Sequence, residues 1–94
     1  MFTLHVDLTV KPKAQQDLEA VYREPFYPAI SVQAGFHTTG LLRPDDDEST
    51  YRMTIAFVSR EFRQQWVATN LHQEIWPKIE SRCTGFSVNC YTAV

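Results

Sequence analysis

The first ten residues alternate between apolar and polar side chains. Apolar residues occupy every second position from Phe2 to Val10, and His5 and Asp7 lie at polar positions between them. A period of two is typical of a β-strand with one buried face and one polar face. Pro12 cannot donate to a β-ladder, so we expect the strand to end there.

The period then changes to that of an amphipathic helix of about three turns. Apolar residues recur at i, i+4, i+7 and i+8, at Ala14, Leu18, Val21 and Tyr22. Glu24-Pro25 is expected to end or kink this helix, because a residue that precedes proline disfavours the helical conformation. A short, irregular helical piece is expected over Phe26–Gln33, and Gly35 suits a left-handed cap.

Three further strands and one long helical stretch complete the pattern. The strands are predicted at 36–43, 50–58 and 85–94, with a bulge at Gly40. The helical stretch runs from Ser59, a suitable N-cap, to Ser81. The order βαββαβ predicts an α+β, ferredoxin-like fold: a four-stranded antiparallel sheet in the order 4-1-3-2 with both helices on one face.

The apolar stripe of the long helical stretch changes direction part-way. One line is defined by Phe62 and Trp66, and the other by Leu71, Ile75 and Ile79. A kink near Asn70 accounts for this change. We therefore expect a packing helix over 59–69, anchored by Trp66, and a second part over 70–81 that is broken again at Pro77.

Composition narrows the class of protein. The 94 residues suit one domain over 1–94, and 44% hydrophobic with 21% charged residues is ordinary for a globular protein. A net charge of −2 disfavours nucleic acid as a partner. The chain has neither an apolar run of about 20 residues nor a signal-peptide pattern, so we expect no membrane partner and a cytoplasmic location. Cys83 and Cys90 are predicted to be free thiols.

The second face of the predicted sheet is not fully polar. Whichever side of each later strand points away from the helices, it carries large apolar groups, such as Leu41 or Phe36, Val58 or Phe57, and Tyr91 or Val88. An exposed apolar patch of this kind usually marks an interface. We therefore expect a homodimer that forms through the sheet faces.

Two clusters contain residue types that can bind metals, and neither is predicted to hold a metal. The acidic run after Pro44 lacks the glycine and spacing of a calcium loop and suits a solvated turn. His5 and Asp7 are neighbours on one strand face, and His37 could supply a third ligand. A hydrogen-bonded network with Arg52 or Thr54 of the adjoining strand is favoured over a metal.

Two side chains of the long helical stretch are candidates for chemistry. Trp66 is expected to face the sheet, where it is either a core residue or the wall of a pocket with one N–H donor. His72 and Asn70 are expected at a pocket rim. There an imidazole could take a proton from a phenol, although a surface histidine needs no function.

These residues resemble the signature of a known family. Phe57-Val58-Ser59 is followed by Phe62, Trp66 and His72, and Gly35-Phe36 opens the second strand. This pattern is similar to that of the antibiotic biosynthesis monooxygenase family. The resemblance implies a dimeric α+β barrel in which each monomer has a cavity between sheet and helices. Members include cofactor-free monooxygenases that oxidise phenols and hydroquinones, and haem-degrading enzymes.

The haem-degrading members can be compared with this chain position by position. They use an asparagine on the first strand, a tryptophan on the second helix and a histidine further on. Trp66 fits the tryptophan, but the place of the asparagine falls at Val6, which neither donates nor accepts. His72 comes earlier than their haem ligand does, so haem degradation is disfavoured.

The resemblance and the aromatic-rich helix together give a functional hypothesis. It is a small monooxygenase without cofactor or metal, acting on an aromatic or quinol-type small molecule. His72 is the candidate catalytic base, and Trp66, Asn70 and Phe62 are the candidate substrate-binding residues. The alternative is a non-catalytic dimeric module of the same fold that binds a small hydrophobic ligand.

Overall fold

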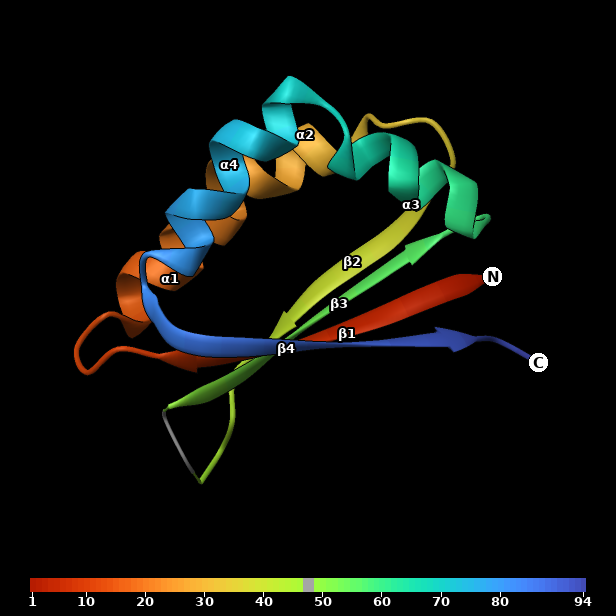
Figure 1. Cartoon of the computed structure of the whole chain (residues 1–94). Helices are drawn as coiled ribbons and strands as arrows, with labels where there is room; N and C mark the ends of the chain where they lie inside the picture. The colour runs from red at the N-terminus through yellow and green to blue at the C-terminus, as the bar shows by residue number, and fades with distance from the viewer. Residues whose placement is uncertain (47–48) are drawn as a thin grey trace.

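The structure, a computed structural model, describes residues 1–46 and 49–94. Four antiparallel strands form one sheet in the order β2-β3-β1-β4. The strands are β1 (Phe2–Val10), β2 (Phe36–Leu42), β3 (Thr50–Phe57) and β4 (Cys83–Thr92). Within the described residues, all the helices lie on one face of the sheet and leave the other face bare (Figure 1). The predicted ferredoxin-like arrangement and its strand order are confirmed.

Strand β1 is the centre of the core. It pairs with β3 on one side and β4 on the other, so that Leu4 lies opposite both Ile55 and Cys90. The alternate positions on its helix-facing side are all buried, namely Phe2, Leu4, Val6, Leu8 and Val10. The predicted division of this strand into an apolar and a polar face therefore holds along its whole length.

The first crossover consists of three short helical pieces: α1 (Gln15–Val21), η1 (Tyr22–Phe26) and α2 (Tyr27–Ser31). The backbone is interrupted at Glu24, which is extended with φ −159° and ψ 120° and precedes Pro25. The kink expected at Glu24-Pro25 is therefore present. It turns the chain so that Phe26 is 2% exposed and belongs to the core.

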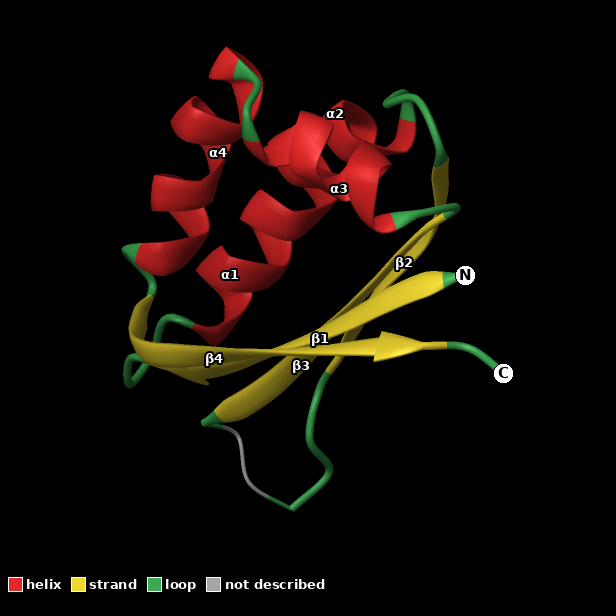
Figure 2. Cartoon of the chain, turned by 45° about the vertical axis from the view of Figure 1, so that its right-hand side comes forward, coloured by secondary structure: helices red, strands yellow, loops and turns green. Residues whose placement is uncertain are grey.

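The second crossover is divided into α3 (Arg60–Val67) and α4 (Asn70–Glu80), as the change of apolar stripe predicts. Figure 2 shows α4 beside α1 at one end of the sheet, with α3 and α2 at the other. The break expected at Pro77 is wrong, because α4 continues through this proline to Glu80. Ile75 and Ile79 are both buried on either side of Pro77, and this packing holds the helix together where a hydrogen bond is missing.

The buried stripe of α4 also differs from the prediction. Leu71 is 38% exposed, so it does not continue the line of Ile75 and Ile79. The residues that face the sheet follow the spacing i, i+3, i+4 and i+7 and are His72, Ile75, Trp76 and Ile79. A histidine thus occupies the first inward position of the helix.

Strand β2 contains its irregularity at a different place from the one expected. The ladder with β3 shifts between Phe36 and Thr38, whereas Gly40 pairs regularly with Thr54. The extra residue changes the parity of the strand, so Phe36 and Leu41 both pack against the core. Leu42 is the large apolar side chain that remains 55% exposed.

A polar cluster that no sequence pattern predicts fastens α1 to the sheet. The carboxylate of Glu19 accepts a hydrogen bond of 2.6 Å from the buried Tyr51 hydroxyl. It also pairs with Arg43, whose Nε and Nη2 lie 3.0 and 2.6 Å from its two oxygens. These hydrogen bonds, Arg43 first, lower the pKa of Glu19 to about 2.

The remaining expectations concern thiols and membrane spans. Cys83 is buried and Cys90 is exposed, and both thiols are free. Cys83 opens β4, two residues earlier than the predicted strand start. In the described part of the chain, none of the helices is long and apolar enough to cross a membrane.

Gly35 joins the two halves of the fold through a close contact. It has a positive φ of 74°, as expected for a left-handed cap, and the ring of Phe62 from α3 lies against its Cα. A side chain at this position would overlap that ring. Phe62 therefore fixes the start of α3 over the turn into β2.

The substitution Gly35→Ala is expected to lower the free energy of unfolding by about 2–5 kcal/mol, because it adds strain at positive φ and a clash with Phe62. Gly85→Ala is the matched control, since no atom lies within 4 Å of the added methyl group. The control should stay within about 0.5 kcal/mol of the wild type. Urea denaturation measures both variants, and equal midpoints would contradict the assigned contact.

Candidate functional site

A cavity of about 160 Å³ lies between the sheet and the helices. Its floor consists of side chains from β1, β3 and β4, and its walls come from η1, α3 and α4. The lining residues are Leu4, Val6, Phe26, Met53, Ile55, Phe57, Arg63, Trp66, Val67, His72, Trp76, Phe86 and Val88. Apart from Arg63, His72 and the indole N–H groups, the side chains of this lining are apolar.

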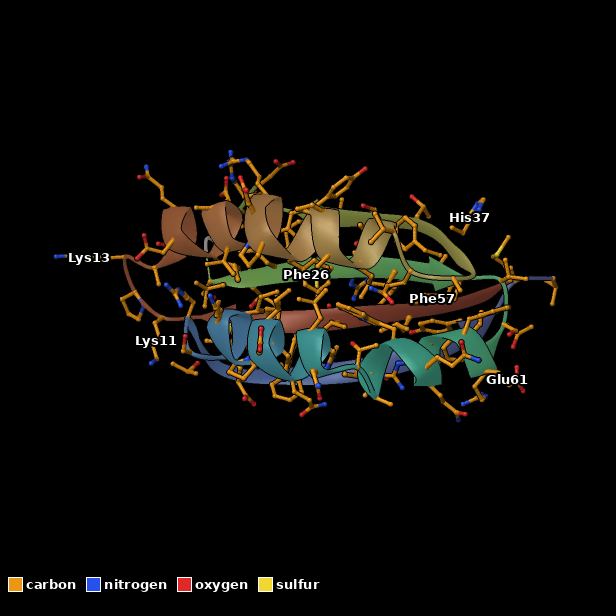
Figure 3. The ribbon with its side chains drawn as sticks, turned by 90° about the horizontal axis from the view of Figure 1, so that it is seen from above. Lys11, Lys13, Phe26, His37, Phe57 and Glu61 are labelled. Carbon is orange, nitrogen blue, oxygen red and sulfur yellow. The ribbon has the colours of Figure 1, made fainter. Side chains whose placement is uncertain are left out.

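The cavity lies where both crossovers are interrupted. Phe26 follows the break at Glu24, and Trp66 and His72 flank the break between α3 and α4. Seen from above, the helices form two rows over the sheet, and Phe26 lies between them (Figure 3). Because each row is interrupted at this level, the helices do not fill the space above the strands.

Trp66 is both a core residue and a wall of the cavity. It is 3% exposed and its ring meets Phe26 edge to face, with ring centroids 6.4 Å apart. The His72 ring meets it at 88°, with centroids 5.2 Å apart. The two interpretations left open by the sequence are thus compatible, because Trp66 belongs to the buried core and also lines the cavity.

One hydroxyl group holds the two sides of the break between α3 and α4. Thr69 Oγ1 donates a hydrogen bond of 2.7 Å to the carbonyl oxygen of Trp66. Thr69 Oγ1 also accepts a hydrogen bond of 3.1 Å from the backbone N–H of His72, which makes Thr69 the N-cap of α4. The relative position of Trp66 and His72 therefore depends on Thr69.

His72 is partly buried among aromatic rings. Its ring stacks on Trp76 at an angle of 10°, with centroids 6.4 Å apart. Within the described residues, its Nδ1 is buried and has no hydrogen-bond partner. Burial, and to a smaller extent the positive charge of Arg63, lowers the pKa of His72 below its ordinary value of 6.5. The imidazole is therefore neutral at pH 7 and able to accept a proton.

Arg63 is a site residue that the sequence analysis missed. It lies one turn before Trp66 and Val67 on α3, so the three side chains share the face that lines the cavity. Their spacing of i, i+3 and i+4 could have indicated this placement. Inward-facing positions of a helix are normally apolar, so a positive charge is not expected there from the sequence.

The structure does not bring Phe62 and Asn70 to the cavity. Phe62 packs against Gly35, one turn before Trp66 and outside the cavity lining. Asn70 is the first residue of α4 and its side chain is exposed. Of the predicted site residues, Trp66 and His72 are the two that share the cavity.

The polar cluster on β1 lies on the bare face of the sheet. Arg52 pairs with Asp7 through contacts of 2.8 and 3.3 Å, which lower the pKa of that carboxyl. His5 lies against the ring of Tyr91, with centroids 5.1 Å apart.

Among residues 1–46 and 49–94, no group of three or more potential metal ligands comes together. His37 is exposed at the end of the molecule (Figure 3). Part of the predicted acidic turn, Asp47 and Glu48, lies outside the described residues.

Comparison with known families agrees with this architecture. The model of the family described as antibiotic biosynthesis monooxygenase matches residues 1–77. The chain belongs to the antibiotic biosynthesis monooxygenase family. The match covers β1 to the middle of α4 and includes Arg63, Trp66, His72 and Trp76.

Solved structures of other proteins share the fold over nearly the whole chain. SnoaB, a cofactor-independent oxygenase from Streptomyces nogalater, has 18% identity and a TM-score of 0.88, covering 99% of this chain and 92% of its own. A conserved protein from Methanosarcina mazei has 14% identity and a TM-score of 0.85, with 96% and 89% covered. At such identities the likeness concerns the fold. The search of curated proteins gave no match.

The depressed pKa of His72 predicts a pH effect on stability. As pH falls below 6.5, the unfolded chain binds a proton at this position more readily than the folded chain does, so folding becomes less favourable. The contribution is absent above that pH. His72→Gln should therefore flatten the decline in the free energy of unfolding between about pH 6.5 and 5.

Denaturation of wild type and variant at several pH values tests this prediction. The carboxyl groups of Glu19 and Asp7 also have lowered pKa values, but they affect stability only at more acidic pH. They are present in both proteins, so the difference between the two curves reports His72. If the free energy of unfolding of the two proteins declined in parallel over the whole pH interval, the pKa of His72 would not be lowered by folding.

Proposed function

We propose that this protein is a cofactor-independent monooxygenase that acts on an aromatic small molecule with an ionisable ring hydroxyl. The observation that supports the proposal is an apolar cavity walled by Trp66 and Trp76, in which His72 is held as a neutral imidazole. Membership of the antibiotic biosynthesis monooxygenase family supports the class of reaction. His72 is the proposed catalytic base, and Trp66 the proposed wall of the substrate site.

In the proposed reaction, His72 accepts the proton of the ring hydroxyl. The resulting anion is electron-rich and reacts directly with dioxygen. One oxygen atom is inserted at a ring carbon to give a quinone, and the other leaves as water with the two hydrogens that the substrate loses. The substrate supplies all the electrons, so this stoichiometry requires no external reductant. The protein contributes orientation, an apolar surrounding and the base.

Oxygen uptake in the presence of a panel of phenols and hydroquinones tests the function. Turnover by the wild type and a decrease of roughly 100-fold or more in His72→Gln are expected, because general-base catalysis contributes on this scale. His37→Gln is the matched control, since His37 is exposed and lies outside the cavity lining. The activity should persist somewhat below pH 6.5, because the pKa of His72 is lowered. Unchanged turnover in His72→Gln would remove the base assignment.

The competing function is a non-catalytic module that binds a small hydrophobic ligand. A closed core behind Trp66 would have favoured it, whereas the structure has a cavity with His72 in its wall. The module predicts that ligands raise the melting temperature without any oxygen uptake. That outcome across the panel would replace the proposed enzyme.

We further propose that two copies associate through the bare face of the sheet in the cytoplasm. Leu42 lies on β2, Tyr91 lies on β4 and Val58 directly follows β3; their exposed fractions are 55%, 51% and 57%. The ladder places Leu42 opposite Arg52 and Tyr91 opposite Thr3, on the side without helices. Large apolar side chains spread over an uncovered sheet support an interface there.

Light scattering at micromolar concentration is expected to give the mass of a dimer. Val58→Asp should shift the protein to a monomer, because the dimer would bury an unpaired carboxylate. Val32→Asp is the control, since Val32 is 78% exposed but ends α2 on the helix-covered side. A wild-type monomer, or equal dissociation in both variants, would contradict this interface.

A further inference from the structure

The charge in the cavity wall is not compensated by the protein. Arg63 lines the cavity and is partly buried, and no carboxylate appears among the lining residues. Within residues 1–46 and 49–94, its guanidinium has neither a hydrogen bond nor an ion pair. His72 cannot compensate it, because an imidazole is neutral or positive. An arginine of a cavity wall with unused donors favours an anion from outside the protein.

The size of the cavity limits what this anion can be attached to. Its volume of about 160 Å³ is close to that of an apolar cavity of about 150 Å³ known to hold one benzene molecule. A single six-membered ring therefore fits without displacing the walls. Larger ring systems would have to extend past Phe86 and Val88 on β4, which are 44% and 40% exposed.

We propose that the cavity binds a single-ring aromatic anion, and that Arg63 holds its carboxylate or phenolate oxygen. The planar guanidinium offers several donors to such oxygens. Trp66 and Trp76 offer apolar ring surfaces to the aromatic part. As a statement about a substrate, the inference rests on the proposed function, whereas the binding of an anion does not.

The position of Arg63 relative to His72 gives the two residues separate tasks. His72 accepts the proton of a ring hydroxyl, and Arg63 stabilises the oxygen that has lost it. Both side chains line the same cavity, and the charge of Arg63 acts on His72. Arg63 is thus a substrate-binding residue that favours the ionised ligand.

Binding is tested with benzoate and its neutral analogue benzamide, neither of which the proposed reaction consumes. The chain has two tryptophans, Trp66 and Trp76, and both line the cavity, so its tryptophan fluorescence reports occupancy. Benzoate should bind at least about tenfold more tightly than benzamide, as a charge-assisted hydrogen bond predicts. Arg63→Met, which keeps an unbranched side chain but removes the guanidinium, should abolish this preference while retaining benzamide binding.

Arg60→Met is the matched control. Arg60 is on the same helix and its guanidinium lies 4.8 Å from the centre of the Phe2 ring, outside the cavity lining. The substitution Arg60→Met also removes one positive charge from α3. A loss of the preference for benzoate in this variant would therefore show that the overall positive potential of the helix, and not contact with Arg63, causes the preference. Equal binding of benzoate and benzamide by the wild type, or an unchanged preference in Arg63→Met, would overturn the proposal. Benzamide binding and the thermal unfolding of Arg63→Met show whether the variant is folded.

A second probe distinguishes phenolate from carboxylate. The ionised form of 4-nitrophenol is yellow, so the fraction ionised on binding is visible at fixed pH. The wild type should increase this fraction and Arg63→Met should not, whereas an increase in both proteins would contradict the role of Arg63. Selective benzoate binding without oxygen uptake from any phenol would remove the proposed function and leave this inference standing. Oxygen uptake from a phenol without any preference for benzoate over benzamide would support the proposed function and overturn this inference.

Discussion

The site depends on one side-chain oxygen, that of Thr69. Its hydrogen bonds of 2.7 and 3.1 Å join the carbonyl of Trp66 to the N–H of His72, across the point where the second crossover is interrupted. A continuous helix would leave no place for these two bonds and would carry Trp66 and His72 on different faces, because six residues correspond to more than one and a half turns. The interruption brings their rings to 5.2 Å. The local capping chemistry of one threonine thus determines the geometry of a cavity wall.

The break between α3 and α4 leaves a cavity because the first crossover is interrupted at the same level of the sheet. Phe26 enters the core directly after the extended Glu24 and meets the edge of Trp66. Two unbroken helices would pack along their whole length, as ridges into grooves, and would close the space over β1 and β3. In this structure the aromatic rings of Phe26 and Trp66 pack against each other beside the cavity. The helices can therefore cover the sheet without filling the space between themselves and the strands.

The strands, their order and the division of the long helical stretch could be predicted, because each follows from a local period or a change of stripe. The haem-type and metal alternatives could also be weighed from single positions such as Val6. Three features could not be predicted: the bulge at His37, the contact between Gly35 and Phe62, and the placement of Arg63. Each depends on a neighbour distant in the sequence or on the registration of two strands. Leu71 was misplaced because apolar character alone favoured it over His72, whereas the direction of α4 is set by its cap at Thr69.

The distribution of charge explains why an anion suits the cavity. The carboxylates that meet arginines do so elsewhere: Glu19 pairs with Arg43 beside α1, and Asp7 pairs with Arg52 on the bare face of the sheet. A carboxylate beside Arg63 would have raised the pKa of His72 and left fewer free donors for a ligand. With Arg63 alone, the lining carries one positive charge and a neutral imidazole. A ligand with one negative charge would neutralise the charge of this lining, which lowers the cost of taking both charges out of water.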